Sequence, residues 1–296
     1  MNGREAARHM RRALGFAVVA LGFGLAAPLR ADVTPVAPPP SATNLWFHVG
    51  ERLVYDITWG ILSVGRTEVE TEWVLHTDGR TLLAIRFKTR TNGVVEQLYP
   101  VEDLQETLID PATFLPVQFL KKSRQGKRRY HELTRFDHGV KKAFWENFIK
   151  NRTKEVAIEA DTRDIISLMY HMRATAHPVG TSFHTKVFTD EKLYDLFVKV
   201  AKKEKVDLAK YGQVASLRFD PEAAFNGLFV RKGKMTLWVS DDPRRLCTRI
   251  TAEVPVAKVR ITLAEVTGPG DDFWVGRHAP GAPETTVAPR GVPATP

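Results

Sequence analysis

Regular alternation of apolar and polar residues dominates the region from residue 50 to 90 and limits the folds open to this chain. The stretch GERLVYDITWGILSVGRTEVE, residues 50–70, begins with apolar side chains at Leu53, Tyr55, Ile57 and Trp59. Successive side chains of a β-strand point to opposite faces of the sheet. The spacing of two therefore predicts a strand with one buried and one solvent-facing side.

Two glycines, Gly60 and Gly65, interrupt this alternation before it resumes at Thr67. Glycine in or beside a strand lets a sheet bend sharply or lets two backbones approach closely. We therefore expect these glycines to shape a first hairpin, with Ile61 and Leu62 in its turn. A phosphate-binding loop is not indicated, because the G-x-G-x-x-G spacing and a following helix are absent.

The same alternation predicts strands through most of the chain. RTEVETEWVLHT and TLLAIRFKTRT flank the Asp-Gly turn in TDGR, and their acidic and basic residues are expected to pair across the hairpin. FLKKSRQGKRRYHEL predicts a second hairpin that turns at Arg124-Gln125-Gly126. Further strands are expected around 94–108, 115–123, 128–136, 182–189, 213–219, 234–240, 245–254 and 256–266.

Two segments depart from simple alternation. ADTRDIISLMYHMRATA places Ile165, Leu168, Met169 and Met172 at helical spacing behind an Asp-Thr start, which predicts one short helix near 162–174. EKLYDLFVKVAKKEKVDL fits a helix and a strand equally well. The whole pattern predicts a mainly β fold: a single curved antiparallel sheet that forms a closed or half-open barrel, with the helix over an opening or on the concave side.

The two ends of the chain differ from its centre. Residues 1–31 have the basic, apolar and small-residue order of a signal peptide, cleaved near Ala26 or Ala31. A proline-rich linker is expected over 32–44, a β-rich domain over 45–267 and a disordered Pro/Gly-rich tail over 268–296. We therefore expect an exported, periplasmic protein with no transmembrane segment in its mature chain.

Charge and cysteine content narrow the classes of partner. Without residues 1–31, 38 Lys and Arg stand against 33 Asp and Glu, a net charge near +5 that does not indicate a nucleic-acid binder. The single cysteine, Cys247, excludes an internal disulfide and a metal site built on cysteines. Its place in the alternating run RRLCTRI indicates a structural thiol rather than a nucleophile.

Basic residues cluster in KKSRQGKRR around the predicted second turn. Such a cluster suits anionic lipid headgroups, lipopolysaccharide or wall polymers. The alternative is a hairpin tip that is charged only to prevent edge-to-edge aggregation. The candidate binding residues are Lys121, Lys122, Arg124, Lys127, Arg128 and Arg129.

Motifs for catalysis are weak. His131 and His138 are seven residues apart in a predicted strand, so they face opposite sides and do not form the H-E-x-x-H site of a zinc protease. No G-x-S-x-G elbow or Walker loop occurs. Carboxylates for a wall or glycan hydrolase would come from Asp103, Glu106, Asp241 and Asp242, although Asp-Asp-Pro is also a common turn. The sequence assigns no catalytic residue, metal or cofactor.

An ordered set of motifs across residues 46–266 resembles the uncharacterised bacterial family domain of unknown function 3108. The set comprises FHVGERLVYDITWGILSVGRTEVE, YPVEDLQETLIDPATFLPVQF, RFDHGVKKAFW, DTRDIISLMYHMRATAHPVGTSF and NGLFVRKGKMTLWVSDDPRRLCTRI. The resemblance implies an exported, mostly β domain of the Gram-negative envelope, and it favours a strand for residues 191–208. It transfers no catalytic residue. The chain departs from the family at Cys247-Thr248, where a proline is common, and in the charged run VAKKEKVD.

These observations favour a non-enzymatic periplasmic binding or carrier module for a lipid-like or other hydrophobic or anionic envelope molecule. A curved sheet with aromatic faces suits such a ligand, although the same aromatics also fit ordinary core packing. The aromatic residues concerned are Trp46, Tyr55, Trp59, Trp73 and Phe87. Two alternatives remain open, namely a scaffold that binds an envelope protein and, less favoured, the carboxylate-dependent hydrolase.

Overall fold

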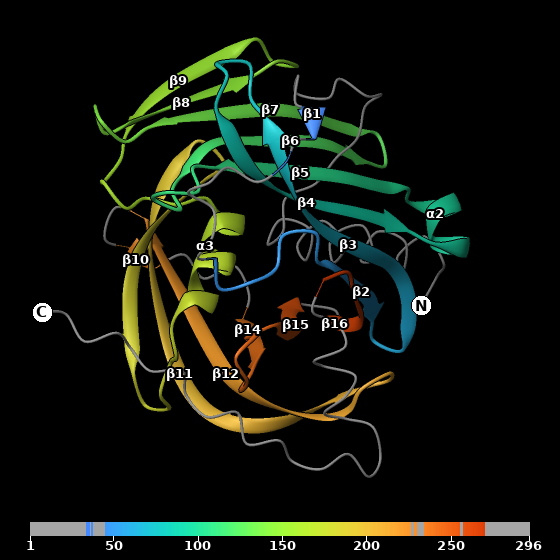
Figure 1. Ribbon diagram of the computed structural model, residues 1–296. Coiled ribbons are helices and arrows are strands. Elements are labelled where there is room, and N and C mark those ends of the chain that lie inside the picture. The colour runs from blue at the N-terminus through green and yellow to red at the C-terminus, as the bar shows by residue number, and fades with distance from the viewer. Residues whose placement is uncertain are drawn as a thin grey trace, which may run out of the picture.

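One strongly curved antiparallel sheet makes up most of the protein (Figure 1). The computed structural model describes residues 34–35, 37, 45–225, 228–229, 234–254 and 257–269. The predicted signal peptide, nearly all of the predicted linker and all but the start of the predicted tail lie outside these residues. The predicted mainly β architecture is confirmed.

The strands run β1 (Thr34–Pro35), β2 (Arg52–Trp59), β3 (Leu62–Leu75), β4 (Thr81–Thr91), β5 (Val101–Ile109), β6 (Pro116–Gln125), β7 (Arg128–Asp137), β8 (Lys142–Asn147) and β9 (Arg152–Ala157). They continue with β10 (Ser182–Thr189), β11 (Lys192–Leu208), β12 (Gly212–Phe225), β13 (Leu228–Phe229), β14 (Lys234–Ser240), β15 (Cys247–Val254) and β16 (Ala257–Thr267). The helices are α2 (Gly93–Leu98), α3 (Ile165–His171) and the 3₁₀ turn η2 (Met172–Ala174).

The sheet curls into a half-open barrel that does not close. Its strand order is β10-β11-β12-β14-β15-β16-β2-β3-β4-β5-β6-β7-β8-β9, with β1 beside β3 and β13 beside β12. Side chains bridge the gap between its two ends: Lys121 Nζ lies 2.7 Å from Asp190 Oδ1, and Lys154 Nζ donates to the Glu191 carbonyl at 3.1 Å. The turn between β10 and β11 thereby contacts the concave side of β6–β9.

The two glycines of the first hairpin have different roles. Gly60 adopts a φ of +60° in the turn with Ile61, a backbone conformation that glycine reaches without steric cost. Gly65 lies where β3 approaches β4, and a Cβ atom there would be 2.4 Å from the Arg90 carbonyl oxygen. One glycine therefore permits the turn, and the other permits the close approach of two strands.

Charged side chains pair across the convex face, as the alternation predicted. Arg86 bonds the carboxylates of Glu72 and Glu106, and Lys88 lies 2.5 Å from Glu70. These pairs join neighbouring strands β3, β4 and β5 on the solvent side of the sheet. The predicted cross-strand pairing of the first long hairpin is confirmed.

Three details of the predicted secondary structure need correction or completion. The strand expected from residue 94 begins only at Val101, because Gly93–Leu98 forms the helical turn α2, and alternation starts after it. Strands β8 and β9 were not predicted, since each has only six residues and β9 is exposed along most of its length. The ambiguous segment 191–208 is strand β11, as the family resemblance implied.

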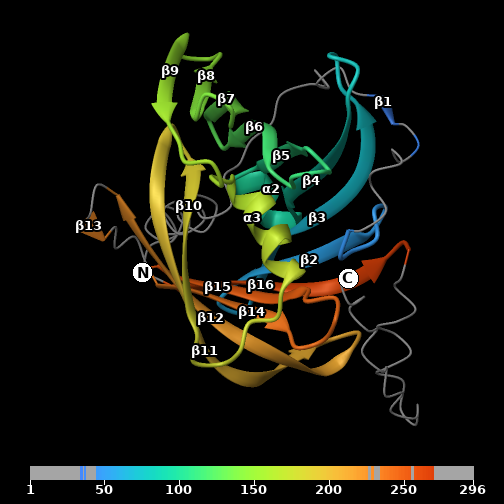
Figure 2. The same cartoon turned by 60° about the vertical axis from the view of Figure 1, so that its left-hand side comes forward.

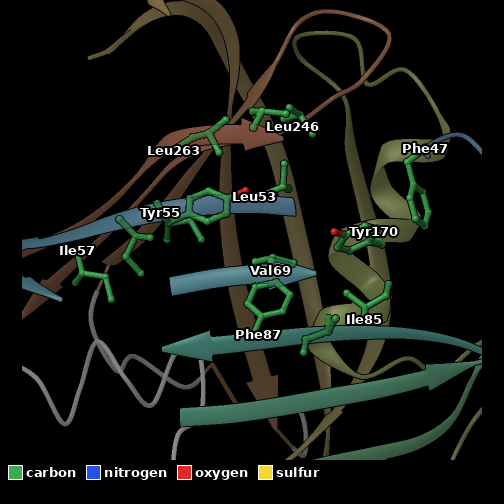
Figure 3. Packing of buried hydrophobic residues seen from close by; sticks show 14 of the residues in the cluster. Phe47, Leu53, Tyr55, Ile57, Val69, Ile85, Phe87, Tyr170, Leu246 and Leu263 are labelled. Carbon is green, nitrogen blue, oxygen red and sulfur yellow. The ribbon is translucent and has the colours of Figure 1, made fainter. Parts of the chain in front are cut away.

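Helix α3 occupies the concave side of the sheet (Figure 2). Ile166, Leu168 and Tyr170 are buried, and Ile166 and Tyr170 belong to the main hydrophobic core. Figure 3 shows Tyr170 directed toward Val69 and Phe87 on the neighbouring strands. The helix predicted near 162–174 is confirmed in type and place. Among the described residues, no helix has the length and apolar character needed to span a bilayer.

Candidate ligand-binding site

A cavity of about 40 Å³ lies between helix α3 and the concave face of the sheet. This volume holds about three water-sized groups or the end of an alkyl chain. Most of its wall is apolar and comes from three parts of the chain: Leu53, Val69 and Phe87 on β2–β4, Phe219, Leu237 and Val239 on β12 and β14, and Met169 and Met172 on the helical segment. The cavity therefore depends on the helix staying against the sheet.

Asp164 fixes the start of this helix to the sheet. Its Oδ1 atom accepts hydrogen bonds from the backbone N–H groups of Ile166 and Ser167 at 2.8 and 3.0 Å, as an N-cap does. Its Oδ2 atom accepts from the Thr107 hydroxyl of β5 at 2.7 Å and from the Ser167 hydroxyl at 2.8 Å. One buried carboxylate thus caps the helix and anchors it.

A second anchor holds the end of the helix from the N-terminal side of the domain. The indole N–H of Trp46 donates to the Tyr170 carbonyl at 2.7 Å. The Phe47 ring meets the Tyr170 ring edge-to-face, with centroids 4.8 Å apart. Residues before the first long strand therefore help to hold α3 in the barrel.

A buried ion cluster lies beside the cavity. The Glu51 carboxylate receives two bonds from the Arg173 guanidinium, at 2.5 and 3.0 Å, and one from Arg244 at 3.1 Å. The Arg173 Nε atom also donates to the Arg244 carbonyl at 3.0 Å. The Glu51 side chain is fully buried, and both arginine side chains are less than a tenth exposed. The cluster joins the residue before β2, the turn η2 and the turn between β14 and β15.

The charge state of this cluster follows from its contacts. Burial raises the pKa of Glu51, but Arg173 and Arg244 outweigh burial and hold that pKa below its ordinary value. Burial lowers the pKa of Arg173, and contact with Glu51 more than reverses this. Because arginine stays protonated in proteins, one carboxylate faces two guanidinium groups. Glu51 thus accepts bonds from two charged groups at once.

Polar groups line only part of the cavity. Arg173 belongs to both the cluster and the cavity wall, and Arg245 and His177 lie on the same wall. Arg245 Nη1 donates to the Arg173 carbonyl at 3.0 Å, and the His177 ring lies 2.8 Å from the Met172 carbonyl. The arrangement offers an apolar pocket with guanidinium groups on one side.

Cys247 also lines the cavity, but it is not suited to nucleophilic chemistry. Burial raises the pKa of its thiol to about 12. The thiolate, which is the reactive form of cysteine, is therefore scarce at neutral pH. This agrees with the structural thiol expected from the sequence.

The six predicted basic residues do not form one continuous patch. Lys121 faces the concave side and pairs with Asp190, Arg124 lies 3.2 Å from Glu102, and Lys122 is buried. The exposed members are Lys127, Arg128 and Arg129 at the turn between β6 and β7. The structure thus brings three of the six candidates together at an exposed tip.

The candidate carboxylates and histidines do not converge. Asp103 and Glu106 lie on opposite faces of β5, because Asp103 is on the concave side and Glu106 bonds Arg86 on the convex side. Asp242 accepts from the backbone N–H groups of Arg244 and Arg245 within its turn. His138 contacts the Pro116 carbonyl, whereas His131 packs on Phe148. No group of three metal-ligating side chains occurs in the described part of the chain.

Asp103 has an unusual environment. Its side chain is buried on the concave face, and neither carboxylate oxygen has a hydrogen-bond partner among the described residues. Burial raises the pKa of Asp103 well above its ordinary value, although the charge of Lys121 acts in the opposite direction. An unpartnered buried carboxylate is costly when it is ionised.

This environment predicts a pH-dependent stability. The proton is bound more tightly in the folded chain, so the contribution of Asp103 is fully present below the unfolded pKa, about 3.9. That contribution is lost as pH rises through the higher folded pKa. We expect Asp103→Asn to unfold at a higher temperature than the native chain at pH 7, with a smaller difference at pH 4. Thermal melts at both pH values test this. An equal difference in melting temperature at pH 7 and pH 4 would contradict this prediction. Asp207→Asn is the control, because Asp207 is exposed.

Sequence reasoning missed the residues that define this site, namely Glu51, Arg173, Arg244 and Arg245. In the sequence each one is an ordinary charged residue: Glu51 precedes a predicted strand, Arg173 is at the end of the predicted helix, and Arg244 and Arg245 follow the Asp-Asp-Pro turn. The turn DDPRR contained candidate site residues in the sequence, but these were its aspartates and not its arginines. The pairing of Glu51 with Arg244 spans 193 positions, which no local pattern reveals.

Comparison with solved structures places the fold among β-barrel-like proteins. A β-barrel-like protein of domain of unknown function DUF1849 from Brucella abortus superimposes with a TM-score of 0.51, at 15% identity over 74% of this chain and 97% of that chain. A candidate lipoprotein from Parabacteroides distasonis has a TM-score of 0.30 at 10% identity, over 75% of this chain and 98% of that chain. LprF from Mycobacterium bovis has a TM-score of 0.18 at 12% identity, over 74% of this chain and 86% of that chain. The last two similarities are too weak to support an argument.

Comparison with curated proteins gives no match. Comparison with protein families matches residues 54–264 to one family, described as "Protein of unknown function (DUF3108)". The matched range contains most of the sheet and helix α3. It also contains Arg173, Arg244 and Arg245, whereas Glu51 lies just before it. Because this range covers most of the chain, the protein belongs to the DUF3108 family.

Proposed function

We propose that this protein is a non-enzymatic binding or carrier module of the cell envelope, and that it holds a lipid-like anion under helix α3. The observation that carries the proposal is the apolar cavity with guanidinium groups on one side. An apolar chain with an acidic head matches both parts of that wall. The signal peptide expected at residues 1–31 supports an envelope location.

The apolar part of the ligand is expected to contact the strand side chains and the two methionines. Methionine is unbranched and polarisable, so it adapts to ligands of irregular shape. The described cavity is smaller than a typical ligand site, which ranges from about 300 to 1,000 Å³. It therefore accepts one end of a ligand, and the remainder extends along the helix or into solvent.

The acidic head is expected near Arg245. The Arg173 guanidinium is engaged by Glu51 and by the Arg244 carbonyl, whereas Arg245 donates to backbone carbonyls through one guanidinium nitrogen. Charge-assisted bonds from a guanidinium to a carboxylate or phosphate are stronger than bonds between neutral groups.

Fluorescence titration with cis-parinaric acid, which has an apolar chain and a carboxylate, tests this proposal. We expect saturable binding by the native chain and at least tenfold weaker binding by Val239→Phe, since a phenyl ring fills part of the cavity. Val117→Phe is the matched control, because Val117 is also a half-buried strand valine but lies outside the cavity. Equal binding by the native chain and Val239→Phe, or no saturable binding, would contradict the proposal.

A second substitution tests the position of the head. Arg245→Gln is expected to weaken binding of cis-parinaric acid about tenfold, the loss of one charge-assisted interaction. Binding of the uncharged probe N-phenyl-1-naphthylamine should stay unchanged. Equal weakening for both probes would contradict a role of Arg245 in anion recognition.

The scaffold alternative rests on one structural observation. Strands β9 and β10 are the two ends of the sheet order, and exposed strand edges are sites at which another chain can add a strand. If this alternative holds, truncation of residues 268–296 or blockage of an edge weakens a protein complex, and the cavity variants have no effect.

A further inference from the structure

One rim of the half-open barrel combines exposed apolar and basic residues. In an antiparallel meander, alternate turns lie at the same end of the sheet. The turn between β6 and β7 and the turn between β8 and β9 are therefore on one rim, which also carries α2 at the ends of β4 and β5 (Figure 1). The turn between β7 and β8 lies on the opposite rim.

The turn between β8 and β9 presents two apolar side chains. Phe148 is 44% exposed and Ile149 is 53% exposed. The backbone N–H of Phe148 donates to the His131 carbonyl at 2.9 Å, and the two rings are 4.5 Å apart. The turn is thus tied to β7, two residues from Arg129. Its apolar pair has a defined position beside the basic tip.

Basic residues surround this pair without any acidic residue in the same segments. The ranges 126–131 and 148–154 contain Lys127, Arg128, Arg129, Lys150, Arg152 and Lys154, and neither contains Asp or Glu. Two of these are engaged elsewhere, since Arg152 lies 3.6 Å from the Glu191 carboxylate and Lys154 donates to the Glu191 carbonyl. Lys127, Arg128, Arg129 and Lys150 are exposed. The nearby carboxylate of Glu132, on β7, accepts hydrogen bonds from the side chains of Asn147 and Trp145 on the adjacent strand β8.

We infer that this rim docks on an anionic lipid bilayer. Phe148 and Ile149 enter the boundary between headgroups and acyl chains, while the flanking cations contact the lipid phosphates. Interfacial binding strength grows with buried apolar area and with attraction to anionic lipids. Each Lys or Arg near an anionic surface contributes about 1 kcal/mol. The inference is independent of whether the cavity binds a ligand.

Three of the basic residues predicted from the sequence, Lys127, Arg128 and Arg129, belong to this rim. The other three do not, because they are buried or paired elsewhere. The apolar pair is what favours a bilayer over a soluble polyanion, since a polyanion offers no apolar phase for Phe148 and Ile149. A bilayer satisfies both kinds of side chain at one surface.

Vesicle flotation tests the inference. Protein recovered from the periplasmic fraction is mixed at low salt with vesicles of phosphatidylglycerol and phosphatidylcholine (1:3), and separately with pure phosphatidylcholine vesicles. We expect binding to the first kind and little to the second. Arg128→Glu/Arg129→Glu and Phe148→Ser/Ile149→Ser should each weaken binding at least tenfold.

Matched controls separate docking from general effects. Lys199→Glu/Lys205→Glu changes the net charge equally at exposed positions of β11, and Val140→Ser removes a 58% exposed apolar residue from the opposite rim. Both should bind as the native chain does, and circular dichroism melts verify that all variants are folded. The inference is overturned if no vesicle binds, if the two charge reversals weaken binding equally, or if Phe148→Ser/Ile149→Ser has no effect.

Discussion

Glu51→Gln is expected to lower the free energy of unfolding by about 3–5 kcal/mol, because it removes a buried carboxylate that bonds two buried guanidinium groups. Glutamine keeps the size of the side chain, so lost packing contributes little. Arg173 and Arg244 would then keep their positive charges in a buried region without the Glu51 carboxylate between them. Urea unfolding followed by circular dichroism measures the difference.

The control is a carboxylate in an exposed pair. Glu155 lies 2.6 Å from Lys142 with about half of its side chain exposed, and Glu155→Gln should change stability by less than about 1 kcal/mol. Arg173→Met should also destabilise the chain, and the double variant should lose less than the sum of the two single variants. A loss below 1 kcal/mol for Glu51→Gln would show that the cluster does not stabilise the fold.

Asp164→Ala is expected to cost about 2–4 kcal/mol, since it removes an N-cap and leaves buried donors without a partner. Two backbone N–H groups and the hydroxyls of Thr107 and Ser167 lose this acceptor. The start of α3 is then no longer held to β5. Thermal unfolding measures the stability change, and hydrogen exchange measures the opening of residues 164–171.

Asp161→Ala is the matched control, because Asp161 lies three residues earlier and is exposed. It should leave both stability and exchange near native values. If the amide hydrogens of residues 164–171 exchanged no faster in Asp164→Ala than in the native chain, Asp164 would not anchor the helix. This conclusion would hold whatever the change in melting temperature.

Local patterns predicted most of the fold because the sheet follows chain order over long stretches. From β2 to β9 each strand pairs with the next, so alternation and turn residues specify both the strands and their partners. Gly60 and Gly65 were singled out for the right physical reasons. The sequence could not show whether the barrel closes, since closure depends on contacts between Asp190 or Glu191 and strands far earlier in the chain.

The candidate site was much less predictable. Strand and helix patterns both predict charged residues on the solvent side, so Glu51 and Arg173 could not be distinguished from solvent-facing charges. The opposite error occurred at KKSRQGKRR, where charge suggested one patch, but Lys122 is buried and Lys121 and Arg124 pair with carboxylates. Phe148 and Ile149 drew no attention because they lie in a hairpin that the alternation did not reveal.

The central claim is that the space under α3 holds a lipid-like anion, and native mass spectrometry tests it most directly. The protein should be purified from the periplasm without detergent, measured intact and then extracted with organic solvent. The account predicts a reproducible adduct with the mass of a lipid-like acid, which is released by extraction and diminished in Val239→Phe. A mass equal to that of the polypeptide alone, in the native chain and in the variant, would contradict it.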